Sequence, residues 1–349
     1  MQQVGAALRR ANVAAVYLAH GTFVGSDALG VLSELARVFP SASASVRQVI
    51  KRIVDKVAGE VGNYTPGFAR CFEESIQQPG QPRIPVRLFN WSSENHHLGR
   101  ADGAVRLINE LVSRRFQPPQ RVLLFGHSHA GNVFALMSNL LGADRQAVDR
   151  FFDAAAIYYR WPVVGCVDIP VWNRVRELLA AETPPLAGVP LDMVTFGTPI
   201  RYGWDARGYA QLLHFIHHRP AEGLPEYRAP FPPKVEDIMA AADGDYVQQL
   251  GIAGTNVMPS VFSWRAWMAD SRLHRLLQDE TGLSSAAERF KAGTIVPDEG
   301  TSLLVDYGRP EGSIAEHLAG HAVYTRKEWL LFHAEEVARR FYAAEPQAA

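Results

Sequence analysis

The sequence predicts an α/β fold in which a mostly parallel sheet is covered by helices on both faces. Six short apolar runs are continuous rather than alternating in polarity, which is typical of strands buried on both faces. Amphipathic helical patterns occur at 101–115, 132–141 and 326–342. Strands that alternate with helices along a chain build a layered α/β domain. The predicted strands are 13–19, 86–90, 121–125, 191–196, 212–217 and 302–306.

The composition is that of a packed globular protein. Apolar residues make up 47% of the 349 residues and charged residues 20%. We expect a single domain over 1–349, with insertions at about 40–80, 150–190 and 219–262. The formal net charge of −1 gives no electrostatic reason to expect a nucleic-acid partner. The two cysteines, Cys71 and Cys166, exclude a disulfide framework.

Other segments bear on location and on partners. No transmembrane segment is predicted and the N-terminus lacks an export-signal pattern, so we expect a cytoplasmic protein. The amphipathic segment 44–60 is compatible with a lid or with contact at a membrane surface, and more commonly with packing on its own protein. The proline-rich segment 219–262 predicts a structured loop or cap. Trp264 and Trp267, three residues apart on a helical pattern, are expected in the core.

A strand-to-helix turn presents the candidate nucleophile, Ser128. The segment Gly126-His127-Ser128-His129-Ala130 follows a predicted strand and precedes a predicted helix. Such a turn strains the nucleophile's backbone, and small residues two before and two after it let strand and helix approach closely. The backbone N–H of His129 would then be one donor to an oxyanion. The alternative is a Gly-Ser turn that only caps the helix.

The histidines beside Ser128 also suggest a metal site, but the pattern is incomplete. A two-metal hydrolase pattern would need Asp at 131 and His at 132, where this chain has Gly131 and Asn132. We therefore expect no metal and no organic cofactor.

A second glycine loop follows the first predicted strand. His20-Gly21 resembles the loop that supplies a second oxyanion donor in hydrolases whose serine lies at a strand-to-helix turn. Glycine lets the backbone of this loop pass close to the nucleophile. The N–H of Thr22 is the expected donor, with that of Phe23 as the alternative. An ordinary turn with His20 buried in the core would give the same local pattern.

The base and the acid should follow the nucleophile in the chain, in the order Ser, Asp or Glu, His. His321 lies just before the last helix and is the expected base, with His317 as the alternative. His333 falls within that helix and is expected to be structural. The acid remains open among the candidates Asp245, Asp306 and Asp243.

Together these segments resemble the class 3 triacylglycerol lipases, a branch of the α/β hydrolases. The resemblance implies the α/β-hydrolase fold, with a Gly-Asp-x-Val loop that presents the acid, and it therefore favours Asp245. The family usually has glycine where Ala130 stands, and the insertions match no lid known in it. The matching segments are His20-Gly21-Thr22, Leu88-Phe89-Asn90-Trp91-Ser92, Phe125-Gly126-His127-Ser128-His129-Ala130-Gly131, Val194-Thr195-Phe196-Gly197-Thr198-Pro199 and Gly244-Asp245-Tyr246-Val247.

The sequence therefore predicts a lipase- or esterase-like serine hydrolase. Ser128 would attack an ester carbonyl, His321 would move the proton, and Asp245 would orient the imidazole. The expected substrate is a small-molecule or lipid ester with an apolar acyl chain. Thioesterase, amidase or acyltransferase chemistry would use the same residues, and a non-catalytic binding protein is the alternative outside enzymes.

Overall fold

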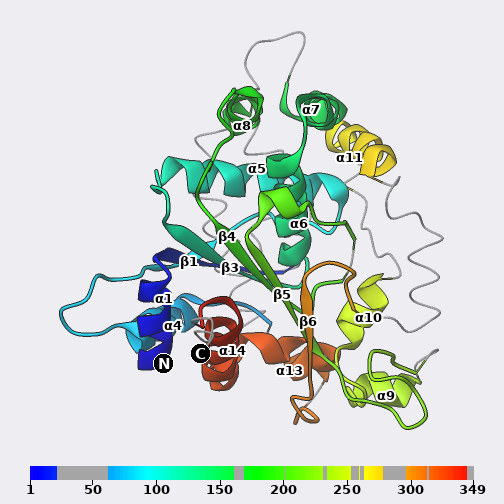
Figure 1. The fold of residues 1–349 in the computed structure, drawn as a ribbon. Coiled ribbons are helices and arrows are strands. Elements are labelled where there is room, and N and C mark those ends of the chain that lie inside the picture. The colour runs from blue at the N-terminus through cyan, green and yellow to red at the C-terminus, as the bar shows by residue number, and fades with distance from the viewer. Residues whose placement is uncertain are drawn as a thin grey trace.

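One parallel sheet forms the centre of the molecule (Figure 1). The computed structural model describes residues 1–21, 62–160, 169–199, 201–230, 234–252, 259, 263–277, 296–312 and 314–343. Within these residues the strand order is β2-β1-β3-β4-β5-β6, and every neighbouring pair is parallel. The strands are β1 (Val13–Ala19), β2 (Val86–Phe89), β3 (Arg121–His127), β4 (Leu191–Phe196), β5 (Gln211–His217) and β6 (Thr301–Val305).

The predicted α/β class and its six strands are confirmed, with small shifts of the ends. The largest shift is in β3, which continues two residues beyond the predicted end at Phe125. Gly126 and His127 stay in the sheet because they pair in register with Thr195 and Phe196 of β4. The strand therefore ends directly at Ser128.

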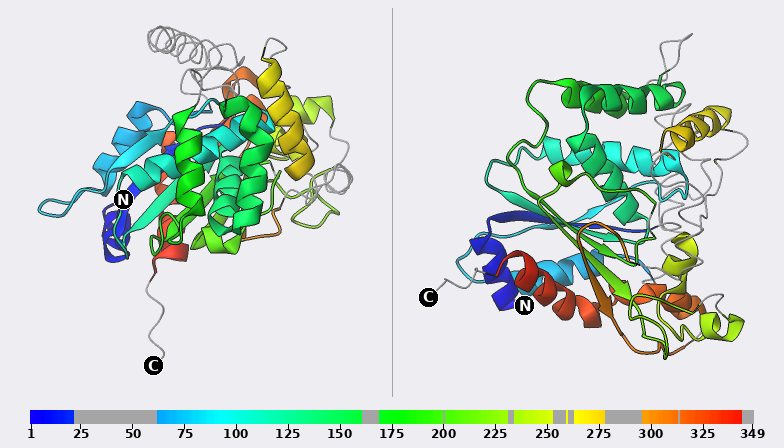
Figure 2. Two further views of the ribbon diagram at one scale, coloured as in Figure 1. Left: turned by 90° about the horizontal axis from the view of Figure 1, so that it is seen from above. Right: turned by 45° about the vertical axis from the view of Figure 1, so that its right-hand side comes forward.

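Helices cover both faces of the sheet in layers (Figures 1 and 2). On one face lie α5 (His97–Ser113) and α6 (Ala130–Gly142), and an outer layer packs on them. That layer consists of α7 (Arg145–Tyr159), α8 (Pro170–Ala180) and α11 (Trp264–Leu277). On the other face lie α1 (Gln2–Arg10), α4 (Pro66–Ile76) and α14 (Leu330–Phe341).

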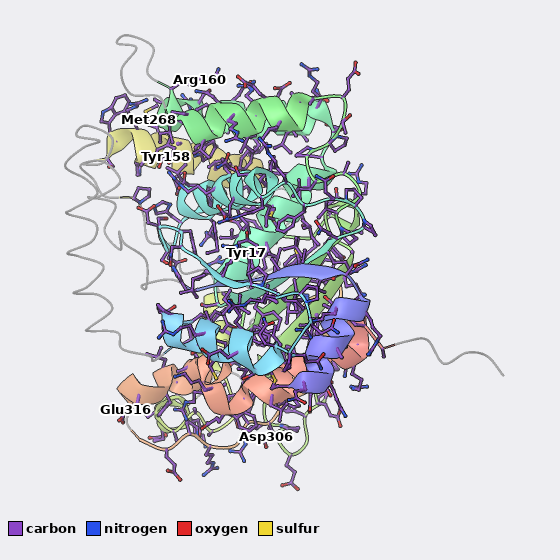
Figure 3. All side chains as sticks on the ribbon, turned by 90° about the vertical axis from the view of Figure 1, so that its left-hand side faces the viewer. Tyr17, Tyr158, Arg160, Met268, Asp306 and Glu316 are labelled. Atoms are coloured by element: carbon purple, nitrogen blue, oxygen red, sulfur yellow. The ribbon has the colours of Figure 1, made fainter. Side chains whose placement is uncertain are left out.

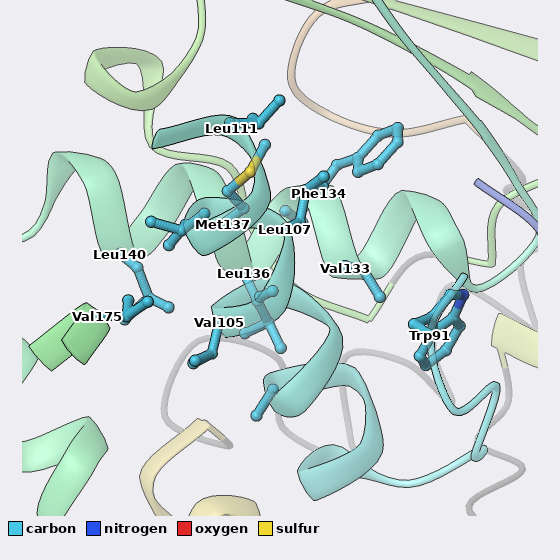
Figure 4. Close-up of a cluster of buried hydrophobic side chains, with 14 of the residues drawn as sticks. Trp91, Val105, Leu107, Leu111, Val133, Phe134, Leu136, Met137, Leu140 and Val175 are labelled. Carbon is cyan, nitrogen blue, oxygen red and sulfur yellow. The ribbon is translucent and has the colours of Figure 1, made fainter. Parts of the chain in front are cut away.

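Alternating side chains of the strands build two separate apolar cores. Tyr17 and Leu124 belong to the core beneath α5 and α6, and Figure 3 places Tyr17 between the layers. Val16 and Leu123 belong to the core beneath α1, α4 and α14. Figure 4 shows side chains of α5 and α6 meeting in the first core. Strands buried on both faces explain why the runs read as continuously apolar.

The described parts of the three insertions contain mostly short helices and loops. In the first, α4 begins directly after Thr65, because the side chain of Thr65 accepts a hydrogen bond from the N–H of Phe68 at 3.1 Å. The amphipathic segment 44–60 lies outside the described residues. The second insertion contributes to α7 and α8. The third contains α9 (Val235–Met239) and α10 (Tyr246–Ile252).

The last part of the chain combines short helical segments with α14. These are α13 (Ile314–His317), a 3₁₀ stretch at Leu318–Thr325 and a 3₁₀ turn at Lys327–Trp329. The closing helix, predicted for 326–342, therefore begins only at Leu330. None of the described helices combines the length and apolar character that crossing a membrane requires.

The expectation that Trp264 and Trp267 lie in the core is wrong. Their exposed fractions are 54% and 44%. The buried face of α11 is instead formed by Arg265, Ala269 and Leu273, which repeat every four residues. The two tryptophans stand on the other side of the helix, and a three-residue spacing alone does not indicate which face is buried.

Candidate active site

The strand order reverses between β1 and β3, and this point marks the candidate site. From β1 the chain crosses to β2 on one side and then returns to β3 on the other. In open parallel sheets, ligands bind outside the carboxyl ends of the strands at such a switch point. His20-Gly21 directly follows β1, and Ser128 directly follows β3. Both loops named from the sequence therefore lie at this point.

Ser128 occupies a strained turn between β3 and α6. Its φ of +55° is in the left-handed region, which costs a non-glycine residue about 1–3 kcal/mol. Two contacts hold the turn: the N–H of Ser128 donates to the carbonyl of Phe196 at 2.8 Å, and Thr198 Oγ1 donates to the carbonyl of Ser128 at 2.7 Å. Ser128 is 5% exposed. The backbone is therefore fixed by the end of the neighbouring strand β4.

Small residues around the turn are required by close packing. A Cβ at Gly126 would lie 2.6 Å from the ring of Phe134 on α6, so strand and helix approach as closely as the sequence predicts. Gly131 leaves room for the side chain of Thr198, the residue that holds Ser128. Ala130 is fully buried, and alanine is therefore small enough at the position where the lipases usually have glycine.

The loop after β1 passes directly over the serine. A Cβ at Gly21 would lie 2.5 Å from Cβ of Ser128 and 3.1 Å from its Oγ, so only glycine fits. Trp91 Nε1 donates to the carbonyl of His20 at 2.8 Å, and a 2.9 Å hydrogen bond joins Ser93 Oγ and His20 Nδ1. The residues after β2 thus position the loop after β1. Thr22 and Phe23, the predicted oxyanion donors of this loop, lie outside the described residues.

His129 directly precedes α6, and the positive charges of two arginines lie near it. Its N–H donates to no acceptor among the described residues, as expected for the first turn of a helix. Burial lowers the pKa of its imidazole well below the usual value, and the nearby charges of Arg100 and Arg201 lower it further. Burial and the charge of Arg100 likewise lower the pKa of Arg201, to about 10. These charges favour a negative charge that develops beside the N–H of His129.

A buried histidine–carboxylate pair lies near the same turn. Nδ1 of His321 donates to Oδ2 of Asp245 at 2.7 Å, and the two residues are 4% and 5% exposed. Nε2 of His321 is buried and has no hydrogen-bond partner among the described residues. With the proton on Nδ1, Nε2 carries the free lone pair that a general base needs.

His127, the last residue of β3, contacts His321. The ring of His127 lies 4.5 Å from that of His321 between centroids, and a 3.1 Å hydrogen bond joins His127 Nε2 to the carbonyl of His321. Burial lowers the pKa of His127 well below its usual value, and His321 adds to this shift. A neutral His127 can donate one proton to that carbonyl. His321 therefore lies beside the residues that flank Ser128.

Backbone geometry explains how the base reaches this place. Leu318, Ala319 and Gly320 all have positive φ, of 48°, 51° and 90°. A Cβ at Gly320 would collide with the carbonyl of Gly244, the residue before Asp245. The loop that carries His321 therefore packs against the loop that carries Asp245.

Asp245 lies at the end of β5, although the proline-rich segment precedes it in the chain. The chain leaves the end of β5 at His218 and returns through an antiparallel bridge between His218 and Gly244. The N–H of Asp245 then donates to the carbonyl of His217 at 3.0 Å, and Oδ1 of Asp245 accepts from the N–H of Gln248 at 2.9 Å. The carboxylate thus lies at the end of β5, although 27 residues separate it from His217.

The other sequence candidates lie in different surroundings. Asp306 pairs with Arg219 at 3.1 Å, its side chain is 48% exposed, and Figure 3 shows it at the periphery. Asp243 accepts a hydrogen bond from the hydroxyl of Tyr246 at 2.6 Å. His317 lines a separate cavity of about 290 Å³. His333 is buried in α14 and pairs with Tyr307. None of these four is hydrogen-bonded to His321.

No family model, curated protein or solved structure matches this chain. Among the described residues, no group of three or more His, Cys, Asp or Glu side chains could hold a metal ion. The cavities described above and in the outer helical layer are not lined by Ser128.

The sequence analysis assigned no role to the residues that support the site, although Trp91 and Thr198 stand in segments that resemble the lipases. Thr198 holds the carbonyl of Ser128, Trp91 and Ser93 hold His20, and Tyr324 contacts Asp245. Trp91, Ser93 and Thr198 lie in loops that follow strands β2 and β4, and Tyr324 lies in the 3₁₀ stretch Leu318–Thr325. Their partners are distant in sequence, so no local pattern indicates the contacts.

Proposed function

We propose that this chain is a serine hydrolase with the α/β-hydrolase fold that cleaves carboxylic esters. The observation that carries the proposal is the buried pair of His321 and Asp245, whose imidazole ring lies 4.5 Å from that of His127, the residue before the strained turn at Ser128. A histidine oriented by a carboxylate, beside a serine at a strand-to-helix turn, is the arrangement that activates a hydroxyl for attack.

The reaction would proceed through an acyl-enzyme. Oγ of Ser128 attacks the ester carbonyl carbon while Nε2 of His321 takes its proton, and the tetrahedral oxyanion collapses as His321 protonates the departing alcohol. Water, activated by the same Nε2, then releases the carboxylic acid and restores Ser128. Asp245 stabilises the imidazolium in both steps without taking a proton itself.

The oxyanion would be held by backbone N–H groups. The N–H of His129 donates to no acceptor among the described residues, and the nearby charges of Arg100 and Arg201 add a favourable field. Thr22 is the proposed second donor. Gly21 supports this part of the proposal, because it brings the loop backbone next to Oγ of Ser128.

A fluorophosphonate probe tests the proposal. The reagent should label the folded protein on one residue, identified as Ser128 by peptide mass mapping, and Ser128→Ala should abolish the labelling. Ser138→Ala is the matched control, because Ser138 is a buried serine on α6 whose hydroxyl donates to the carbonyl of Ala135 at 2.8 Å and accepts from the N–H of Asp205 at 3.3 Å. A folded protein that stays unlabelled, or a label on another residue, would favour a non-catalytic protein.

A substrate panel then separates the related chemistries. Matched chromogenic esters, thioesters and anilides with the same acyl chain should show the highest kcat/KM for the esters. Preference for thioesters or anilides would indicate a thioesterase or amidase that uses the same residues. Transfer to an added alcohol in place of water would indicate an acyltransferase.

A further inference from the structure

A tyrosine hydroxyl shares the carboxylate oxygen that accepts the proton of His321. The hydroxyl of Tyr324 donates to Oδ2 of Asp245 at 3.0 Å, and the same Oδ2 accepts from Nδ1 of His321 at 2.7 Å. We propose that Tyr324 is a positioning residue, which fixes Asp245 and limits the negative charge that its Oδ2 offers to His321. This inference rests on the proposed function.

The direction of the tyrosine hydrogen bond follows from its second partner. The backbone N–H of His217 donates to the hydroxyl oxygen of Tyr324 at 2.7 Å. An oxygen that already accepts from an N–H directs its own proton elsewhere, and Oδ2 of Asp245 is the acceptor within reach. Burial raises the pKa of Tyr324 well above its usual value, and the charge of Asp245 raises it further. The hydroxyl therefore keeps its proton and remains a donor.

The backbone is shaped to permit this contact. Gly197, which follows β4, has a φ of +56°. A Cβ at this position would lie 2.5 Å from Oδ2 of Asp245 and 2.5 Å from Cε2 of Tyr324. Tyr324 is fully buried, and its ring also packs against His127 with centroids 5.7 Å apart. The tyrosine, the acid and the base are therefore positioned as one packed unit.

The titratable groups around His321 do not dominate the acid limb of the pH dependence of activity. Burial lowers the pKa of the surrounding histidines and raises the pKa of the surrounding tyrosines. In both cases burial favours the neutral form of the side chain. A change in the acid limb of activity would therefore report on His321. The groups are His127, His129, His217, Tyr307 and Tyr324.

Removing the hydroxyl should strengthen the hold of Asp245 on the imidazolium. In Tyr324→Phe, Oδ2 loses one donor and interacts more strongly with the imidazolium of His321. The acid limb of kcat/KM should move up by about half to one pH unit, because the base must be deprotonated. The plateau should fall up to about tenfold, because Asp245 is less firmly positioned.

Tyr307→Phe is the matched control. Tyr307 is a buried tyrosine whose ring lies 5.6 Å from that of Tyr324, and its hydroxyl bonds Nε2 of His333 at 2.7 Å rather than Asp245. This variant also loses one buried hydroxyl but should leave the acid limb unchanged. An unshifted acid limb in Tyr324→Phe, or an equal shift in Tyr307→Phe, would overturn the inference.

A second measurement does not require activity. The Nδ1 proton of His321 should give a low-field proton NMR resonance that disappears in His321→Gln. This resonance should move further downfield in Tyr324→Phe. It should move upfield when 3-fluorotyrosine, a stronger donor of nearly the same shape, replaces Tyr324. No movement in either variant would reject the role of Tyr324. Absence of probe labelling in wild type, with the resonance shifts present, would reject only the proposed hydrolase.

Discussion

At the scale of single residues, protonation states are arranged around one free nitrogen. Nε2 of His321 lies in a buried environment in which the imidazoles of His127 and His129 are held neutral by desolvation. Neutral neighbours do not repel the proton that His321 must take up, whereas charged ones would. The nearest fixed negative charge is Asp245, which therefore controls the orientation of the ring.

Asp245→Asn should nearly abolish turnover. The amide would donate to Nδ1, so the imidazole proton would move to Nε2, which could then no longer accept from Ser128. We expect kcat for the best ester of the panel to fall by a factor on the order of 10³–10⁴. Steady-state kinetics at the pH optimum measures the effect.

Asp306→Asn is the matched control for this prediction. Its carboxylate pairs with Arg219 at the surface and is not hydrogen-bonded to His321, so kcat should stay within about twofold of wild type. Full activity in Asp245→Asn, or a large loss in Asp306→Asn, would show that another carboxylate orients the base.

At the scale of elements, α14 introduces a buried histidine into the apolar core. His333 packs against the rings of Phe196 and Phe215, with centroids 4.8 Å and 5.0 Å away, and its Nε2 bonds the hydroxyl of Tyr307. Burial lowers the pKa of His333 to about 3. The helix can therefore pack on the sheet only while this imidazole is neutral.

This burial predicts a loss of stability in acid. The pKa of His333 in the folded state lies below its usual value, so the unfolded chain binds more protons as the pH falls below about 6.5. The stability that the neutral ring contributes is present above that pH and is lost progressively toward pH 3. Between pH 7.5 and pH 5, the contribution of this one group falls by about 2 kcal/mol.

His333→Gln should flatten the pH dependence. Glutamine cannot take up a proton. Between pH 7.5 and pH 5, the free energy of unfolding of the variant should therefore decline by about 2 kcal/mol less than that of wild type. Urea denaturation at the two pH values measures both proteins. Parallel declines would show that His333 is already charged or solvated in the folded state.

At the scale of the whole molecule, the two edges of the sheet have different roles. At the amino edge, Arg121 forms a bidentate pair with the buried Asp192 at 2.6 Å and 2.8 Å, and the hydroxyl of Tyr342 donates to the same carboxylate at 2.8 Å. This cluster joins β3, β4 and the end of α14. The candidate site lies at the opposite, carboxyl edge.

Stability and activity should therefore separate in Asp192→Ala. Leaving Arg121 without its partner should lower the free energy of unfolding by about 3 kcal/mol, toward the smaller end for buried pairs because Arg121 is partly exposed. Asp192 pairs with Leu123, five residues before Ser128, roughly 16 Å along the strand. The kcat/KM of the folded variant should thus stay within about twofold of wild type.

Arg339→Ala provides the comparison for the stability measurement. Arg339 forms an exposed pair with Glu336 on α14, and its loss should leave the denaturation midpoint close to that of wild type. Equal denaturation midpoints for the Asp192 and Arg339 variants would contradict the role of the amino-edge cluster.

The sequence by itself predicted the described strands, the helices α5, α6 and α14, and the strand-to-helix turn at Ser128. Continuous apolar runs predicted all six strands, because burial on both faces acts on every residue of a strand. Gly126 and Gly21 indicated close backbone approaches, because a missing side chain is visible in the sequence.

Only the tertiary structure decided which groups meet. Asp245, Asp306 and Asp243 are alike in sequence, and it is the bridge between His218 and Gly244 that brings Asp245 to His321. The contact of Tyr324 with that carboxylate and the outward face of Trp264 were likewise invisible. Such contacts join residues far apart in the chain, and their energies depend on packing between elements rather than on any local pattern.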